Sequence, residues 1–172
     1  TINFANNTVL QTVANSAFLN SGITSLDLSQ ATKLLTISNN AFQGCASLTE
    51  VKVPKSLTSF GNNVFGNPNA TSGQSNGYCT SLTTIDLSST QVTSLPNNLF
   101  QGCTSLSNVK LPAGLTSIGE TAFQNTTSLK TIDIPASVTT INGSAFAGSG
   151  LTTIDLSATK VTVIKGGTFE NA

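Results

Sequence analysis

Apolar and polar positions recur along the chain with a period of about 23 residues. Each period holds two short segments in which apolar residues alternate with polar ones. One segment has the form Leu-x-x-Ile-x-Leu/Ile, as at Leu129, Ile132 and Ile134, and the other has the form Leu-x-x-Ile, as at Leu115 and Ile118. Alternation of this kind indicates half-buried β-strand. The pattern therefore predicts a longer main strand and a shorter second strand in every unit.

Phenylalanine marks the register of these units. Seven of the nine Phe residues lie 23 or 24 residues apart, with one interval of 35: Phe18, Phe42, Phe65, Phe100, Phe123, Phe146 and Phe169. The residues around each Phe are too few for a stable helix and predict a short turn or a single helical or 3₁₀ turn. One unit cannot bury its own apolar residues, but stacked units can. We therefore expect about seven main strands in one stack, with these Phe side chains inside it.

The 35-residue interval contains a loop insertion, residues 66–78, within the third full unit. Its sequence, GNPNATSGQSNGY, is rich in Gly, Asn and Ser, which is typical of a loop. Insertions in repeat proteins often lie on the binding face, and Tyr78 is the only Tyr of the chain, so Tyr78 is a candidate binding residue. A tolerated surface loop is the alternative. Residues 1–172 form one domain in this interpretation, truncated at both ends from a longer array.

These motifs resemble leucine-rich repeats of the BspA-like, or Treponema-type, family. The family signature joins Ala-Phe and a Cys to Leu-x-x-Ile-x-Ile-Pro, and here it reads Ala41-Phe42-Gln43-Gly44-Cys45, then Leu48, Val51, Val53 and Pro54. Three units depart from it and end in Asp-Leu-Ser. The resemblance implies a right-handed superhelix with a concave parallel β-sheet and short turns on the convex side. It also implies bacterial or protist cell-surface proteins that adhere to other cells.

Charged residues gather in one column of the main strands. The position between the two inward apolar residues should point outward, and it holds four of the seven acidic residues and two of the seven Lys. In order, the column reads Asn3, Asp27, Lys52, Asp86, Lys110, Asp133 and Asp155. Opposite charges on neighbouring strands stabilise a sheet weakly. The column is thus either a solvated ion ladder or the centre of a concave binding face. Asp133 and Asp155 stand side by side, as paired carboxylates do in retaining glycosidases, but an open face supplies no pocket for catalysis.

Composition excludes several functions. The chain has no His, no Arg and a formal net charge of zero, so His-dependent catalysis, His-ligated zinc and nucleic-acid binding are not expected. No apolar run is long enough to span a membrane. Cys45, Cys79 and Cys103 occupy the same position in three successive units. We expect buried free thiols there rather than a disulfide or a thiolate site, because stacked side chains point in parallel.

The predicted function is non-catalytic adhesion or protein recognition at a cell surface, without catalytic, cofactor or metal-binding residues. The partners expected are protein or glycan ligands on host or other cells, and the segment is expected to be monomeric and extracellular. A structural spacer in a longer surface protein is the first alternative. An ice-binding solenoid, suggested by columns of Thr on the second strands, or a carbohydrate-active solenoid is a further alternative.

Overall fold

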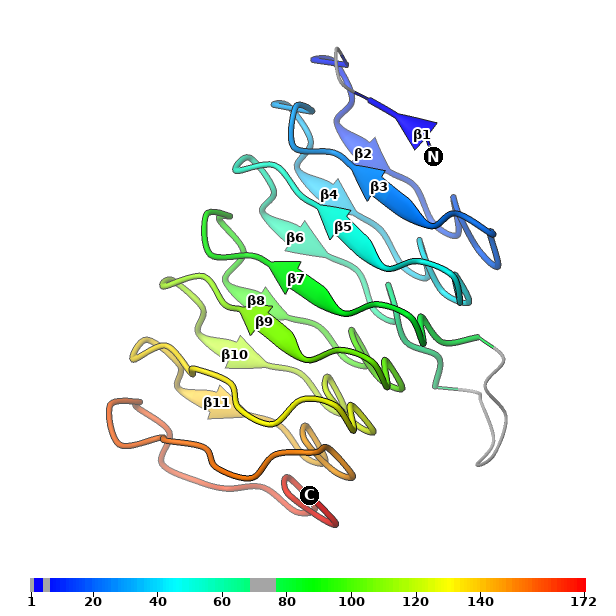
Figure 1. The fold of residues 1–172 in the computed structure, drawn as a ribbon. Coiled ribbons are helices and arrows are strands. Elements are labelled where there is room, and N and C mark those ends of the chain that lie inside the picture. The colour runs from blue at the N-terminus through cyan, green and yellow to red at the C-terminus, as the bar shows by residue number, and fades with distance from the viewer. Residues whose placement is uncertain (1, 5–6, 69–76) are drawn as a thin grey trace.

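The chain winds into a stack of parallel rungs, each rung being one repeat unit (Figure 1). The computed structural model describes residues 2–4, 7–68 and 77–172. Eleven short strands occur among these residues, and successive strands of each sheet pair in parallel one rung apart. The predicted solenoid of stacked parallel strands is confirmed.

The main strands form a five-stranded parallel sheet on one side of the stack, in the order β1-β3-β5-β7-β9. Their bounds are β1 Ile2–Asn3, β3 Ser25–Asp27, β5 Glu50–Lys52, β7 Thr84–Asp86 and β9 Asn108–Lys110. The central residue of β3, β5, β7 and β9 is buried, while the residue after it is exposed, as the alternation predicts.

The prediction of seven main strands is wrong in one respect. Residues 131–134 and 153–156 continue the path of the main strands, and Ile132 and Ile134 are buried on either side of the exposed Asp133. They form no strand, however, because no backbone hydrogen bond joins residues 131–134 to β9 in the described part of the chain. The main sheet therefore ends at β9, while the rungs continue.

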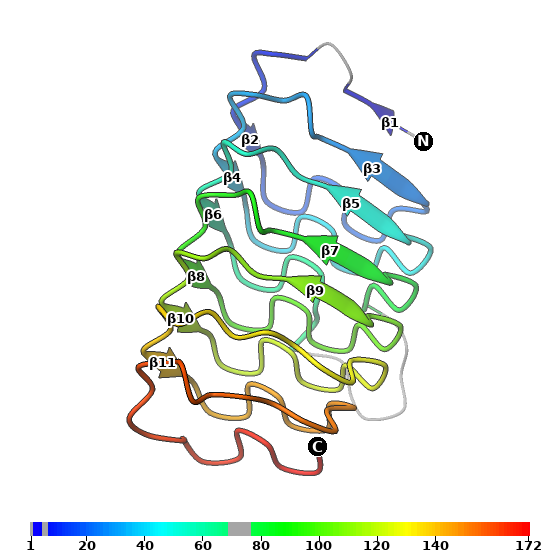
Figure 2. The same cartoon turned by 60° about the vertical axis from the view of Figure 1, so that its left-hand side comes forward.

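The second strands lie on another side of the stack, along the left-hand edge of Figure 2. They form two three-stranded parallel sheets, β2-β4-β6 and β8-β10-β11. Their bounds are β2 Thr12–Val13, β4 Thr36–Ile37, β6 Ser59–Phe60, β8 Ser94–Leu95, β10 Ser117–Ile118 and β11 Thr140–Ile141. The break between the two sheets falls at Phe60, where the other second strands place an aliphatic side chain inward.

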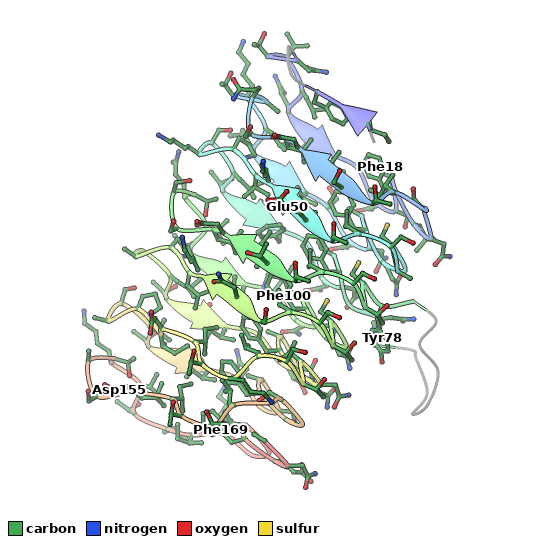
Figure 3. The ribbon with its side chains drawn as sticks, viewed as in Figure 1. Phe18, Glu50, Tyr78, Phe100, Asp155 and Phe169 are labelled. Atoms are coloured by element: carbon green, nitrogen blue, oxygen red, sulfur yellow. The ribbon has the colours of Figure 1, made fainter. Side chains whose placement is uncertain are left out.

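The seven in-register Phe residues form a continuous column, which we call the Phe stack. Neighbouring rings are stacked with centroids 5.1–5.7 Å apart from Phe18 to Phe169. The five inner rings are fully buried, and the two end rings are half-buried. Phe18, Phe100 and Phe169 follow one another down the array in Figure 3. The predicted register is confirmed, and the Phe stack runs through the core of the solenoid beside the buried Leu, Ile and Val side chains.

The chain around each Phe forms a hydrogen-bonded turn, and the described residues contain no helix. Asn residues with positive φ support these turns, since Asn tolerates the left-handed conformation better than most residues do. The Nδ2 atom of Asn63 donates to Asn40 Oδ1 at 3.0 Å, and Asn98 Nδ2 donates to Asn63 Oδ1 at 2.9 Å. Side chains in successive turns thus bond along the array, which holds the turns in line.

The loop insertion leaves the register of the repeat intact. Cys79 N donates to Phe65 O, just as Cys45 N donates to Phe42 O and Cys103 N donates to Phe100 O in units without an insertion. The chain therefore leaves the rung after Phe65 and rejoins it before Cys79. Residues 69–76 lie outside the described part of the chain.

The three Cys residues are free and buried, as predicted. Each thiol donates to the carbonyl of the Phe one rung earlier: Cys45 to Phe18 at 3.0 Å, Cys79 to Phe42 at 3.0 Å and Cys103 to Phe65 at 3.8 Å. Burial raises the pKa of Cys103 far above that of an ordinary thiol. The three side chains pack the turns, and Cys103 carries little thiolate at neutral pH.

Candidate binding face

The outer face of the main sheet carries the predicted charged column in register. Asp27 of β3 lies opposite Lys52 of β5, and Asp86 of β7 lies opposite Lys110 of β9. The side chains point outward because the residues on either side of them are inward apolar residues of the core. Asp133 and Asp155 occupy the same position on the two rungs after β9, and both are exposed. The side chain of Asn3, at the start of the column, is not among the described parts.

The charges pair backwards along the array. Lys52 Nζ lies 4.0 Å from Asp27 Oδ2, and Lys110 Nζ lies 3.2 Å from Asp86 Oδ2. All four side chains are at least half exposed, so each pair stabilises the fold by about 0–1 kcal/mol. Because both lysines turn toward the preceding rung, neither neutralises the acid that follows it.

Serine residues fix the carboxylates of the three Asp-Leu-Ser units. The backbone N–H groups of Ser29, Ser88 and Ser157 donate to the Asp two residues earlier at 2.8–3.0 Å, and the Ser88 hydroxyl also donates to Asp86 Oδ1 at 2.6 Å. Hydrogen bonds from Ser88 are the main cause that lowers the pKa of Asp86, with a smaller contribution from Lys110. Bonds from the corresponding Ser lower the pKa of Asp27 and Asp155.

Asp133 differs from the other acids of the column. The residue two positions later is Pro135, which has no N–H group to donate, so the turn that holds the other three carboxylates cannot form. No hydrogen bond or ion pair to the Asp133 side chain occurs among the described residues. Asp133 is therefore the one acid of this column whose carboxylate has neither a hydrogen-bond nor an ion-pair partner among the described residues.

Tyr78 lies at the edge of the array, away from the charged column (Figure 3). Its ring lies flat against Gly102 of the next rung, where an added Cβ would come within 2.3 Å of Tyr78 Cδ1. Partial burial raises the pKa of the phenol. One face of the ring is thus used in packing, and Tyr78 stays a predicted binding residue only through its half-exposed part. The structure does not bring Tyr78 together with the charged column.

Two openings on the main sheet were not expected from the sequence. One, of about 200 Å³, lies where β5 and β7 diverge beyond their single paired position. The other opening lies between β9 and residues 131–135 and includes Leu111 and Pro135 among its lining residues.

The missing N–H group at Pro135 is the sequence signal that could have identified Asp133 as an acid without a hydrogen bond from its own turn.

The described residues contain no group of three or more acidic or Cys side chains placed to hold a metal ion. They also contain no helix long and apolar enough to cross a membrane. The face offers an array of weakly paired charges, hydroxyl groups and two carboxylates outside any ion pair, Asp133 and Asp155, all of them suited to reversible contacts.

The chain belongs to the family of BspA-type leucine-rich-repeat regions, whose model matches residues 1–74 and 75–172. The predicted family resemblance is confirmed. A search of curated protein sequences gives no significant match.

Solved structures support the same assignment. A leucine-rich cell surface protein from Faecalibacterium prausnitzii A2-165 is 27% identical over 89% of this chain and 44% of that one, with a TM-score of 0.58. A leucine-rich-repeat protein from Eubacterium ventriosum is 25% identical over 77% of this chain and 45% of that one, with a TM-score of 0.52. The chain thus spans less than half the length of these two proteins.

The leucine-rich-repeat protein of T. pallidum shares the fold. It is 19% identical over 81% of this chain and 70% of that one, with a TM-score of 0.58. At this level of identity the likeness concerns architecture alone.

Proposed function

We propose that the chain is a non-catalytic recognition module of a cell-surface protein, and that the outer face of its main sheet contacts protein or glycan ligands on other cells. The observation that supports this most is the regular column of exposed charges on that face. The F. prausnitzii protein with the same architecture is described as a cell surface protein, which supports the location.

The composition of the face suits weak, repeated contacts. Hot spots of tight interfaces are rich in Trp, Tyr and Arg, yet the chain has no Trp or Arg, and its one Tyr packs on Gly102. Polar contacts repeated on successive rungs gain strength when many act together. Adhesion through many modest contacts along a longer array therefore fits this segment better than tight binding to a single site.

Charge reversal on the main face tests the proposal. We expect Lys52→Glu with Lys110→Glu to change binding of the folded chain to extracellular matrix proteins and to glycan arrays at least several-fold. Both lysines are exposed, so the thermal melting temperature should fall only slightly. The matched control is Lys33→Glu with Lys160→Glu, which makes the same change in net charge at exposed positions outside the column.

An equal change of binding in both double variants would show that net charge, not the main face, drives adhesion. A wild-type chain that binds none of these surfaces would favour the spacer function instead. The scarcity of aromatic and Arg side chains is the observation that keeps the spacer as a second candidate.

A further inference from the structure

The main sheet is open between β9 and residues 131–134. Two adjoining hollows of about 400 Å³ each occupy this gap, and they share Val109, Lys110 and Asp133 as lining residues. The rungs remain closed elsewhere: Phe100 and Phe123 stack at 5.3 Å, and β8 pairs with β10. Figure 2 shows β9 as the last arrow of the main sheet, with the next rung continuing as coil. The gap is therefore an open cleft on the main-sheet face, while the same two rungs stay in contact at the Phe stack and at the second strands.

Backbone groups line this cleft without partners. Asn108 N donates to Thr83 O, and Lys110 O accepts from Leu87 N, so the backbone of both residues faces β7. Successive residues of a parallel strand bond to opposite sides, so the N–H and C=O groups of Val109 face away from β7, toward the cleft. No backbone hydrogen bond from residues 131–134 reaches them in the described chain. The cleft thus offers a carbonyl acceptor at Val109 that a closed sheet would have used.

The charge in the cleft is also unbalanced. Lys110 lies on one wall but bonds back to Asp86 at 3.2 Å, which leaves Asp133 on the other wall without a cation. Along the column, the alternation of Asp and Lys would place a Lys on the rung after Asp133, yet that position holds Asp155. The alternation of Asp and Lys therefore stops at Asp133, whose carboxylate lies beside the cleft without a lysine of the column to neutralise it.

We propose that this cleft binds an arginine side chain presented by an extended segment of a protein ligand. The guanidinium group donates to the Asp133 carboxylate and to the Val109 carbonyl, because its planar fork supplies several donors at once. Its aliphatic stem lies on Val109, Leu111 and Pro135, which are among the apolar residues of the lining. This inference rests on the proposed recognition function and names the part of the face and the ligand chemistry involved.

An NMR titration of the chain with short peptides tests the proposal. The probe is a blocked pentapeptide with a central arginine, and its counterparts carry citrulline, which has the same shape without the charge, or lysine. We expect the arginine peptide to bind with a Kd on the order of millimolar and to shift the amide signals of Val109 and Leu111. Citrulline should weaken binding about tenfold, and lysine should weaken it measurably because it lacks the fork.

Two variants with the same change in net charge separate the cleft from the general charge of the face. Asp133→Asn should weaken binding of the arginine peptide about tenfold, whereas Asp155→Asn, whose carboxylate accepts from Ser157 outside the cleft, should leave it unchanged. Equal effects of the two variants, equal binding of the citrulline or lysine peptide, or shifts confined to another surface would each overturn the proposal. Adhesion that survives Asp133→Asn unchanged would refute the cleft while leaving the proposed function standing.

Discussion

The Phe stack and the main sheet follow the same repeat, but only the Phe stack is continuous. Ring centroids along the stack keep nearly the same spacing from Phe18 to Phe169, including across the insertion. The main sheet narrows to a single paired position between β5 and β7 and ends at β9. Buried rings must fill their space, since an empty one leaves a cavity, whereas exposed backbone groups can bond to water instead. The stack therefore holds the fold, and the main sheet can open.

The largest effect is expected from a gap in the Phe stack. Phe123 is fully buried and stacks on Phe100 and Phe146, so Phe123→Ala should lower the free energy of unfolding by about 3–5 kcal/mol. Urea denaturation followed by circular dichroism measures this loss. Phe169→Ala, at the half-buried end of the stack, is the matched control and should cost clearly less. Similar losses in the two variants would contradict the central place given to the stack.

A smaller effect is expected where the insertion rejoins the Phe edge. Gly102 has φ of 71°, and a Cβ there would strike the Tyr78 ring, so Gly102→Ala should cost about 1–3 kcal/mol. Gly114→Ala is the control, because Gly114 has no atom within 4 Å of an added Cβ. Thermal unfolding compares the two variants.

The steric part of this cost can be isolated. Adding Tyr78→Ala to Gly102→Ala removes the clash and leaves the strain of the positive φ. The double variant should therefore lose less free energy of unfolding than the sum of the losses in the two single variants. Strict additivity would show that Tyr78 and Gly102 are not in contact.

The smallest effect is expected on the main face, in the titration of Asp86. Hydrogen bonds from Ser88 lower the pKa of this carboxyl in the folded chain below its unfolded value of about 3.9. The stability gained is therefore present above about pH 4 and is lost as the pH falls through the folded pKa. Because Asp86 is exposed, the gain should be slight.

Carboxyl-carbon NMR titration of wild type and Ser88→Ala measures this effect directly. We expect the pKa of Asp86 to rise in Ser88→Ala, while the pKa of Asp27, capped by its own Ser29, stays unchanged. An unchanged pKa of Asp86 would show that the Ser88 hydroxyl does not cause the shift and would leave it to the backbone N–H of residue 88 and to Lys110.

The sequence predicts features that depend on volume and periodicity. Spacing alone predicts the Phe register, the buried thiols and the position of the insertion. Each inward side chain must fill the same site in the core of its rung, so its position in the repeat determines where it lies. The charged column also lies where alternation puts it. The sequence does not predict that β9 is the last main strand, since residues 131–134 carry the same apolar pattern as their neighbours. Whether two neighbouring strands form backbone hydrogen bonds depends on small rotations between rungs. The apolar pattern of the sequence does not report such rotations.

The sequence also does not predict which acid Lys52 and Lys110 pair with, because each of them has an Asp on the preceding rung and another on the following rung. The contrast between Asp-x-Ser and Asp-x-Pro was visible, however. It separates acids held by their own turn from the free Asp133, and the physical reason is only the missing N–H group of Pro135.

The course of the chain within each rung has a mechanical consequence. Strands run across the axis of the array, so the hydrogen bonds between rungs point along that axis. A pull on the two ends loads these bonds one rung at a time, as in opening a zipper, and each rung rests only on its neighbours. A released rung of 23 residues would give up one strand spacing of about 4.8 Å and extend to roughly 80 Å. Such a segment would lengthen stepwise under tension while the remaining rungs keep their outer face intact.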